Sequence, residues 1–221
     1  MKKNIILGAR LLMPDFQRGG DILPLDQSFT KVWEDSASNL SYKTKILCVT
    51  QKDINPDFNL GANKVFAFLA YLKKHIKSFN FVLLADTLDV VFLNKGLFEF
   101  MKPNTLYVGD EPCCLGINWI LQNSYPFLFS NEYKEWFNSN KDLPLLNTGL
   151  IGGEVSVVID ILECMSNMLF DYTKGLDIGA DMFCLNYCAY NSKYPIIHGE
   201  PFNTVFKSFD HDNTYCYVAH K

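Results

Sequence analysis

Two aspartates follow an apolar stretch in the middle of the chain. Residues 81–85 (Phe-Val-Leu-Leu-Ala) predict a buried strand, Asp86 and Asp89 come just after it, and a second apolar run begins at Val90. Carboxylates between two buried segments are costly unless a cation compensates their charge. Ligands of open α/β sheets bind at the carboxyl ends of the strands. The two acids therefore favour a Mg²⁺ or Mn²⁺ site that also takes oxygens from a substrate diphosphate. The structural alternative is a turn acid beside a helix-capping or salt-bridged acid.

The composition is that of a globular protein with a sizeable core. The chain has 221 residues, of which 48% are hydrophobic and 20% charged, a size within the range of one large α/β domain or two small ones. No linker or domain boundary stands out in the sequence, so we expect a single domain over residues 1–221. The net charge of −4, without a basic block, argues against nucleic-acid binding. No apolar segment of the sequence approaches the roughly 20 residues of a transmembrane helix.

The amino terminus and the cysteines favour a cytoplasmic protein. Lys2 and Lys3 precede an apolar run that stops at Arg10, which is too short for a signal peptide and predicts a first β-strand. The seven cysteines lie mostly in apolar stretches, so we expect buried, reduced thiols. Cys184 and Cys188 share a predicted helix face, but no second close pair of ligands completes a zinc site.

Predicted strands and helices alternate along the chain. Hydrophobic patterns predict strands at residues 3–9, 45–50, 81–85, 105–108, 194–197 and 215–219, and helices at 27–40, 62–77, 96–101, 154–170 and 181–190. Residues 145–153 predict a glycine-punctuated strand or turn, and residues 112–140 predict helices and a long loop. This alternation is typical of an α/β fold with a mostly parallel sheet flanked by helices.

Five short motifs follow one another in a distinctive order. They are Gly61-Ala62-Asn63-Lys64-Val65, Asp86-Thr87-Leu88-Asp89-Val90, Leu146-Asn147-Thr148-Gly149-Leu150-Ile151-Gly152-Gly153, Ala180-Asp181-Met182-Phe183-Cys184-Leu185-Asn186 and Tyr217-Val218-Ala219-His220-Lys221. In this order they resemble glycosyltransferases of the GT-A fold. The resemblance is nearest to the glycosyltransferase domain of lysyl hydroxylases and related collagen glycosyltransferases, and more distant to the glycogenin and galactinol synthase group. It covers roughly residues 45–221 and implies a Rossmann-like, mixed and mostly parallel sheet.

The resemblance implies a metal site. Asp86 and Asp89 are similar to the metal-binding acids of a D-x-x-D variant of the D-x-D motif, and Asp86 would also contact the ribose of the nucleotide. The third ligand in such enzymes is a histidine at the end of a late strand. His220 is the expected ligand, and His198, which also ends a predicted strand, is its rival. For either histidine, the alternative is a hydrogen-bonded residue at a strand end.

The resemblance also implies donor-binding residues. Asn147, Thr148, Gly149 and Gly152 would face the donor sugar, where a side chain at either glycine would fill the space that the sugar needs. A glycine-rich turn or bulge is the alternative.

Further residues complete the expected donor site. Asp181 and Asn147 are the candidate catalytic residues, and Asp181 is alternatively a helix N-cap. The family's glutamine after this acid is Met182 here, so no side-chain amide is available at that position. Thr87, Lys64 and Lys221 are counted with the donor-binding residues, although both lysines are equally compatible with solvated side chains.

The resemblance therefore implies a hexosyltransferase that uses a nucleotide-sugar, with a UDP-sugar and Mn²⁺ or Mg²⁺ expected. It favours retention of the anomeric configuration, by front-face attack or through a covalent intermediate. The acceptor, a carbohydrate or a protein, is not identified. For the aromatic residues of 112–140 we expect one of two roles: they line an acceptor groove, or they pack in a core or an oligomer interface. These residues are Trp119, Tyr125, Phe127, Phe129, Tyr133 and Trp136.

Two alternative functions follow from the same residues. A nucleotidyltransferase acting on a sugar phosphate would use a basic, glycine-rich loop after the first strand, for which Gly8-Ala9-Arg10 and Arg18-Gly19-Gly20 are candidates. A non-catalytic, degenerate relative would serve as a binding module.

Overall fold

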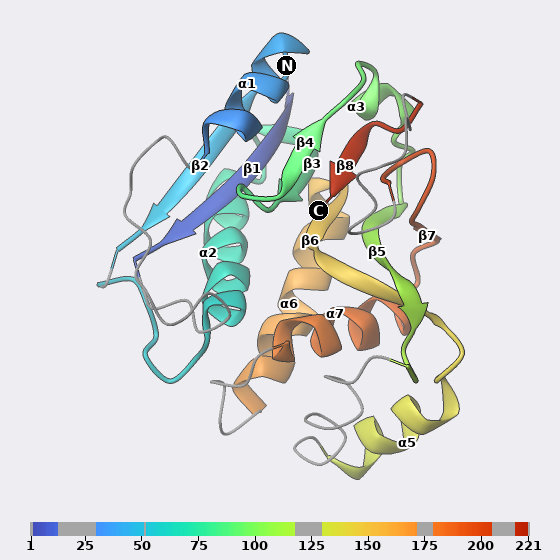
Figure 1. The fold of residues 1–221 in the computed structure, drawn as a ribbon. Helices are drawn as coiled ribbons and strands as arrows, with labels where there is room; N and C mark the ends of the chain where they lie inside the picture. Colours follow the sequence, from blue (N-terminus) through green and yellow to red (C-terminus); the bar gives the residue numbers. More distant parts are fainter. Residues whose placement is uncertain are drawn as a thin grey trace.

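A computed structural model describes residues 2–12, 30–50, 52–117, 130–171, 179–204 and 215–220. Its centre is a six-stranded sheet with the strand order β2-β1-β3-β6-β5-β7 (Figure 1). The strands are β1 (Lys3–Leu11), β2 (Thr44–Val49), β3 (Phe79–Ala85), β5 (Leu106–Cys114), β6 (Pro144–Glu154) and β7 (Ile196–Ile197). In this sheet β6 alone runs opposite to the others, because it pairs antiparallel with both β3 and β5. The mixed, mostly parallel α/β sheet expected from the sequence is confirmed.

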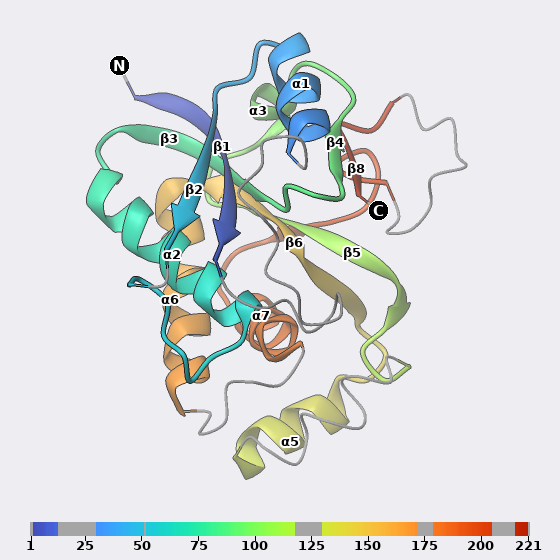
Figure 2. The same ribbon diagram turned by 60° about the vertical axis from the view of Figure 1, so that its left-hand side comes forward.

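Helices and a small second sheet cover the two faces of this sheet. The helices α2 (Leu60–His75), α6 (Val155–Asp171) and α7 (Ala180–Tyr190) pack together on one face, as Figures 1 and 2 show. The other face is covered by α1 (Lys31–Asn39), α3 (Leu97–Phe100) and an antiparallel pair formed by β4 (Val90–Phe92) and β8 (Val218–His220). The helix α5 (Asn131–Ser139) lies at one end of the molecule, against α7.

The central strands are apolar because both of their faces are buried. Successive side chains of a strand point to opposite faces. On β3, Val82 and Leu84 belong to the core under α2, α6 and α7, while Phe81 and Leu83 belong to the core under α1 and β4. A strand covered on both sides reads as a continuous apolar run, which is why residues 81–85 were recognisable in the sequence.

The structure corrects several details of the sequence-based prediction. β5 continues to Cys114, inside the region where helices and a loop were expected. Of the two alternatives for residues 145–153, the strand is confirmed, since residues 144–154 form one long strand. Cys164 of α6 and Cys188 of α7 form a disulfide, so the expectation of reduced thiols was wrong for this pair. The two cysteines come together because α6 and α7 pack side by side. None of the described helices is both long and apolar enough to cross a membrane.

β6 is irregular where it passes the end of β3. On the β5 side, Val108 pairs with Ile151 but the next residue, Gly109, pairs with Asn147, so the register passes over three residues of β6. On the β3 side, Leu150 still pairs with Ala85, and the Asp86 N–H donates to the carbonyl of Gly149. A bulge of this kind bends the strand and redirects its side chains. Residues 148 and 149 therefore lie outside the regular ladder with β5, and Gly149 is held beside Asp86.

Asn186 of α7 fixes the strand just before this irregular segment. Its side-chain amide accepts a hydrogen bond from the Leu146 N–H and donates to the Leu146 carbonyl, both at 2.9 Å. It also donates to the carbonyl of Met182, and the residue is fully buried. The side-chain amide of Asn186 thus makes with the Leu146 backbone the two hydrogen bonds that a neighbouring strand would otherwise make.

Replacing Asn186 should destabilise the protein strongly. Asn186→Ala leaves the N–H and the carbonyl of Leu146 buried without these partners, and we expect a loss of about 2–4 kcal/mol in the free energy of unfolding. Asn191→Ala is the matched control, because Asn191 is exposed and its side chain donates to the carbonyl of Tyr187 near the end of the same helix. Urea unfolding measures both variants, and similar losses in the two would contradict the role given to Asn186.

Candidate functional site

The register between β4 and β8 brings His220 to the two aspartates. Asp86 follows the last residue of β3, and a turn at residues 87–89 leads into β4. Val90, the first residue of β4, pairs with His220 of β8, so Asp89 lies beside the imidazole. One ligand atom from each of Asp86, Asp89 and His220 lies within 4.8 Å of the others, and the His220 Nε2 to Asp89 Oδ1 distance is 4.0 Å. The structure therefore gathers the three residues that the sequence proposed as metal ligands.

Gly149 of β6 makes room for the imidazole of His220. A Cβ atom at Gly149 would lie 2.3 Å from His220 Cε1 and 2.4 Å from Nε2, and one at Gly109 would lie 3.6 Å from Nδ1. His220 is 2% exposed, and its backbone N–H donates to the Thr204 hydroxyl. Burial lowers the pKa of His220 to about 4, against the opposing attraction of Asp86. The imidazole is thus neutral at pH 7, which is the form that binds a metal.

A buried polar network holds the strand that carries His220. Asp110, in the middle of β5, accepts a hydrogen bond from the Asn203 side chain at 2.9 Å and pairs with His198 Nδ1 at 3.2 Å. Asn203 is fully buried and forms a bridge with Val218 of β8, while the Thr204 N–H donates to the Val218 carbonyl. His198 is therefore a partner of Asp110 and lies outside the Asp86–Asp89–His220 group.

Lys64 is the cation of the carboxylate cluster. Its ammonium contacts Asp86 Oδ1, and its side chain is 12% exposed. Burial alone would lower the pKa of Lys64, but the attraction of Asp86 and Asp181 raises it above its ordinary value. Lys64 is therefore a largely buried ammonium that two acids attract, and not a solvated lysine.

Asp181 is the second acid that attracts Lys64. It accepts a hydrogen bond from the Thr148 hydroxyl at 3.0 Å and is 8% exposed. Its carboxylate lies against Gly61, where a Cβ atom would come within 2.6 Å of it. The N-cap of α7 is Gly179 and not Asp181, so the capping alternative for Asp181 was wrong.

The remaining residues of the Lys64 motif fix the start of α2. Asn59 caps the helix by accepting from the Ala62 N–H. The amide of Asn63 accepts from the Asn55 N–H and donates to the carbonyls of Asn55 and Phe58, which ties the preceding loop to the helix. With Gly61 against Asp181, these contacts place Lys64 at the end of β3.

Asn147 has a positioning role in the structure. Its side-chain oxygen accepts from the Gly149 N–H at 2.6 Å, a local turn that bends β6, and its amide nitrogen donates to Glu111. It is 6% exposed. These contacts hold Gly149 in the place that His220 needs.

Two other residues expected at the donor are used for packing. A Cβ atom at Gly152 would meet Met101 at 2.9 Å and Leu83 at 3.0 Å, so this glycine faces the core and the expected donor contact was wrong. The methyl group of Thr87 lies against Gly8 and points to the α1 side of the sheet, where a Cβ at Gly8 would come within 2.3 Å of it.

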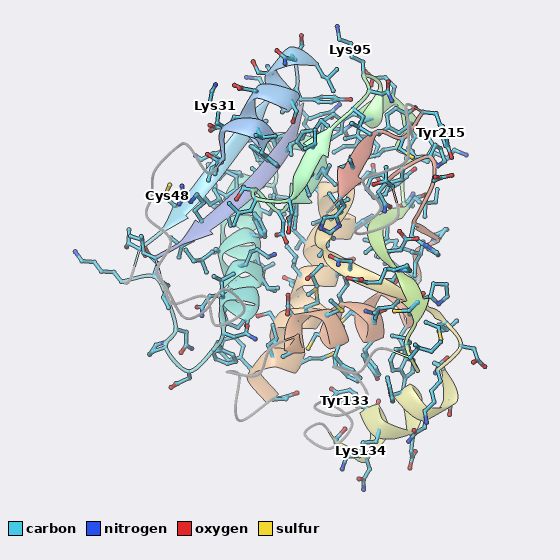
Figure 3. The ribbon with its side chains drawn as sticks, viewed as in Figure 1. Lys31, Cys48, Lys95, Tyr133, Lys134 and Tyr215 are labelled. Carbon is cyan, nitrogen blue, oxygen red and sulfur yellow. A yellow bond between two sulfur atoms is a disulfide. The ribbon has the colours of Figure 1, made fainter. Side chains whose placement is uncertain are left out.

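Several sequence-based candidates fall elsewhere. Lys221 and the Arg18-Gly19-Gly20 segment lie outside the described residues, as do Trp119, Tyr125, Phe127 and Phe129. Gly8-Ala9-Arg10 is part of β1 and pairs with β2, so it is not a phosphate-binding loop. Tyr133, labelled in Figure 3, packs edge-on against Tyr187 of α7, as does Trp136. The described aromatics of this region therefore join α5 to α7.

The structure adds residues that sequence reasoning missed. Asp110 and Glu111 follow the apolar run at residues 106–108, which is the same strand-end signal that singled out Asp86. Asn203 and Thr204 do not follow an apolar run, so no sequence pattern marks them. Their role comes from their contacts with Val218 of β8, which only the folded chain brings together.

The donor set suits a divalent cation. Two carboxylates and a neutral imidazole are ligands that Mn²⁺ accepts, and Mg²⁺ prefers the oxygens. Two donors bonded to one ion at about 2.2 Å lie at most about 4.4 Å apart, close to the spacing of the three side chains. The residues present therefore fit a metal ion.

Comparison with solved structures supports the fold. No protein-family model matches the chain, and no curated protein sequence matches it either. The chain is similar to the crystal structure of a glycosyltransferase involved in the glycosylation of the major capsid of PBCV-1. The match has a TM-score of 0.54 at 13% sequence identity and covers 99% of this chain and 92% of the other. The chain thus has a glycosyltransferase fold, and nothing in the match singles out the lysyl hydroxylase or glycogenin groups.

The buried neutral histidine predicts a pH dependence of the metal-free protein. The pKa of His220 is about 4 in the folded protein and 6.5 ordinarily, so the unfolded chain binds one more proton between these pH values. The free energy of unfolding should therefore decrease as the pH falls from 6.5 toward 4, by up to about 3 kcal/mol from this residue. Urea unfolding in the presence of a chelator measures the change, which should be smaller in His220→Gln. An equal pH dependence in the two proteins would contradict a buried neutral imidazole.

Proposed function

We propose that this chain is a metal-dependent glycosyltransferase that takes its sugar from a nucleotide-sugar, with a UDP-sugar as the donor. The observation that carries the proposal is the convergence of Asp86, Asp89 and His220 at the carboxyl end of β3. That edge of an α/β sheet is the usual place for a ligand, and the fold is one that a solved glycosyltransferase shares.

In this proposal Asp86, Asp89 and His220 hold Mn²⁺ or Mg²⁺. The bound ion would neutralise the donor diphosphate and stabilise the charge on the leaving group. The buried imidazole is already neutral and needs no deprotonation to act as a ligand. Gly149 leaves a niche for its ring, because a side chain at this position would occupy the same space.

The donor sugar is assigned to the side of the cluster formed by Thr148 and Asp181. The hydroxyl of Thr148 donates its one hydrogen bond to Asp181. The Thr148 oxygen can therefore still accept a hydrogen bond from a sugar hydroxyl. The carboxylate of Asp181 is held by this hydrogen bond and by the attraction of Lys64, so it is fixed before the donor arrives. Preorganised polar groups of this kind favour the charge that develops in the transition state.

Uridine and a retaining reaction are proposed from the motif resemblance. The competing nucleotidyltransferase reading is weakened because Gly8-Ala9-Arg10 lies within a strand.

A ligand panel with the purified protein tests the function. UDP-sugars should raise the melting temperature more with Mn²⁺ than with a chelator, and more than GDP- or CDP-sugars do, because a ligand that binds the folded state stabilises it. Asp89→Asn should lose most of the Mn²⁺-dependent part of the shift and the release of UDP from the donor. Asp57→Asn, at an exposed position, is the control and should behave as the wild type.

Each alternative function has its own outcome in this panel. A preference for nucleoside triphosphates together with a sugar phosphate would identify a nucleotidyltransferase. Binding of carbohydrate without any nucleotide effect would identify a binding module. A metal-independent shift with UDP-sugars would contradict the metal proposal.

The glycine niche provides a second, independent prediction. Gly149→Ala should weaken Mn²⁺ binding by roughly tenfold or more, since its methyl group would displace the His220 ring from the cluster. Gly109→Ala is the matched control, because its methyl group would lie 3.6 Å from the same ring. Electron paramagnetic resonance of free Mn²⁺ measures both affinities. Equal affinities would show that His220 does not depend on this niche.

A further inference from the structure

We propose that Lys64 couples metal binding to nucleotide binding: its ammonium compensates the acids of the empty site, weakens binding of the metal alone, and makes tight metal binding depend on a diphosphate. This inference rests on the proposed function and concerns how the same site is regulated.

The first observation is that Lys64 shares an acid with the candidate metal site. Its ammonium contacts Asp86 Oδ1, and Asp86 is one of the three residues whose ligand atoms lie within 4.8 Å of one another. Asp89 also acts on Lys64 electrostatically. A metal ion at this place and the ammonium would therefore be close neighbours of the same sign.

The second observation is that Lys64 is held where it is. Its side chain is 12% exposed, contacts Asp86 and is attracted by Asp181. Asn63, the residue before it, is 2% exposed and ties the helix to the preceding loop. Moving the ammonium into water would take it away from both acids, and this is costly above all for Asp181, which is 8% exposed, whereas the Asp86 side chain is 32% exposed. The metal must then bind beside Lys64 and not in exchange for it.

These two observations set the energetics of the site. A divalent ion that enters alone is repelled by Lys64 and shares the charge of Asp86 with it. A diphosphate brings negative charge that both cations attract, so it removes the repulsion. By linkage, the factor by which the diphosphate tightens metal binding equals the factor by which the metal tightens diphosphate binding.

The chain offers a matched control on the same helix. Lys73 of α2 pairs with Glu163 at 2.6 Å, and both side chains are about half exposed (54% and 43%). Its removal takes away one positive charge from the same helix while leaving the candidate site intact.

The experiment measures Mn²⁺ binding to wild type, Lys64→Met, Lys64→Gln and Lys73→Met, each alone and with saturating UDP. Free Mn²⁺ is followed by electron paramagnetic resonance, and circular dichroism checks the folding of each variant. Lys64→Gln keeps a hydrogen-bond donor near Asp86 without the charge, so it separates the charge from a positioning role. Lys64→Arg, which restores the charge, should return the wild-type pattern.

We expect both neutral variants of Lys64 to bind Mn²⁺ alone roughly tenfold more tightly than the wild type, and UDP to tighten their Mn²⁺ binding several-fold less. Lys73→Met should match the wild type in both measurements. Unchanged or weaker binding of Mn²⁺ alone in Lys64→Gln would overturn the inference, because Lys64 would then only hold Asp86 in place. If UDP has no effect on Mn²⁺ binding in the wild type, the proposed function itself fails, which is a different result from a normal UDP effect that Lys64 does not control.

Discussion

The cluster of acids at the carboxyl end of β3 is the constraint on which the rest of the structure depends. Asp86, Asp89 and Asp181 lie partly or fully buried, where uncompensated carboxylates are costly. Two surrounding elements bring groups that compensate this charge: the helix α2 brings the ammonium of Lys64, and β6 brings the hydroxyl of Thr148. The strand β8 brings the neutral imidazole of His220 beside the same acids. The positions of these elements are therefore set by electrostatics as well as by apolar packing.

Close approach between elements is what makes this compensation possible. The imidazole of His220 lies where a side chain of residue 149 would be, and the carboxylate of Asp181 lies where a side chain of residue 61 would be. The glycines of the motifs thus leave space for the protein's own polar groups. That differs from the expectation that Gly149 leaves space for a sugar, and it explains why His220 can be almost completely buried.

Hydrogen bonds from outside the motifs then hold this arrangement. Asn186 anchors β6 at Leu146, Asn147 bends the strand toward Gly149, and Asn203 links Asp110 to β8. All three amides are buried, so their partners would lose hydrogen bonds in a place that water does not reach. The chemistry of the site therefore depends on side chains that would not contact a ligand.

The sequence by itself determined the local elements and the acids. Continuous apolar runs mark strands that are buried on both faces, and the residues just after such a run, Asp86 among them, lie at the edge of the sheet where ligands bind. Only the tertiary structure decided which distant residues meet these acids. The pairing of Val90 with His220 and the contact of His198 with Asp110 separated two histidines that look alike in the sequence. The reversed direction of β6, the disulfide between α6 and α7 and the core-facing position of Gly152 were likewise not predictable. The reason is physical: periodicity records which side of an element is buried, whereas strand register and helix packing are set by contacts between residues far apart in the chain.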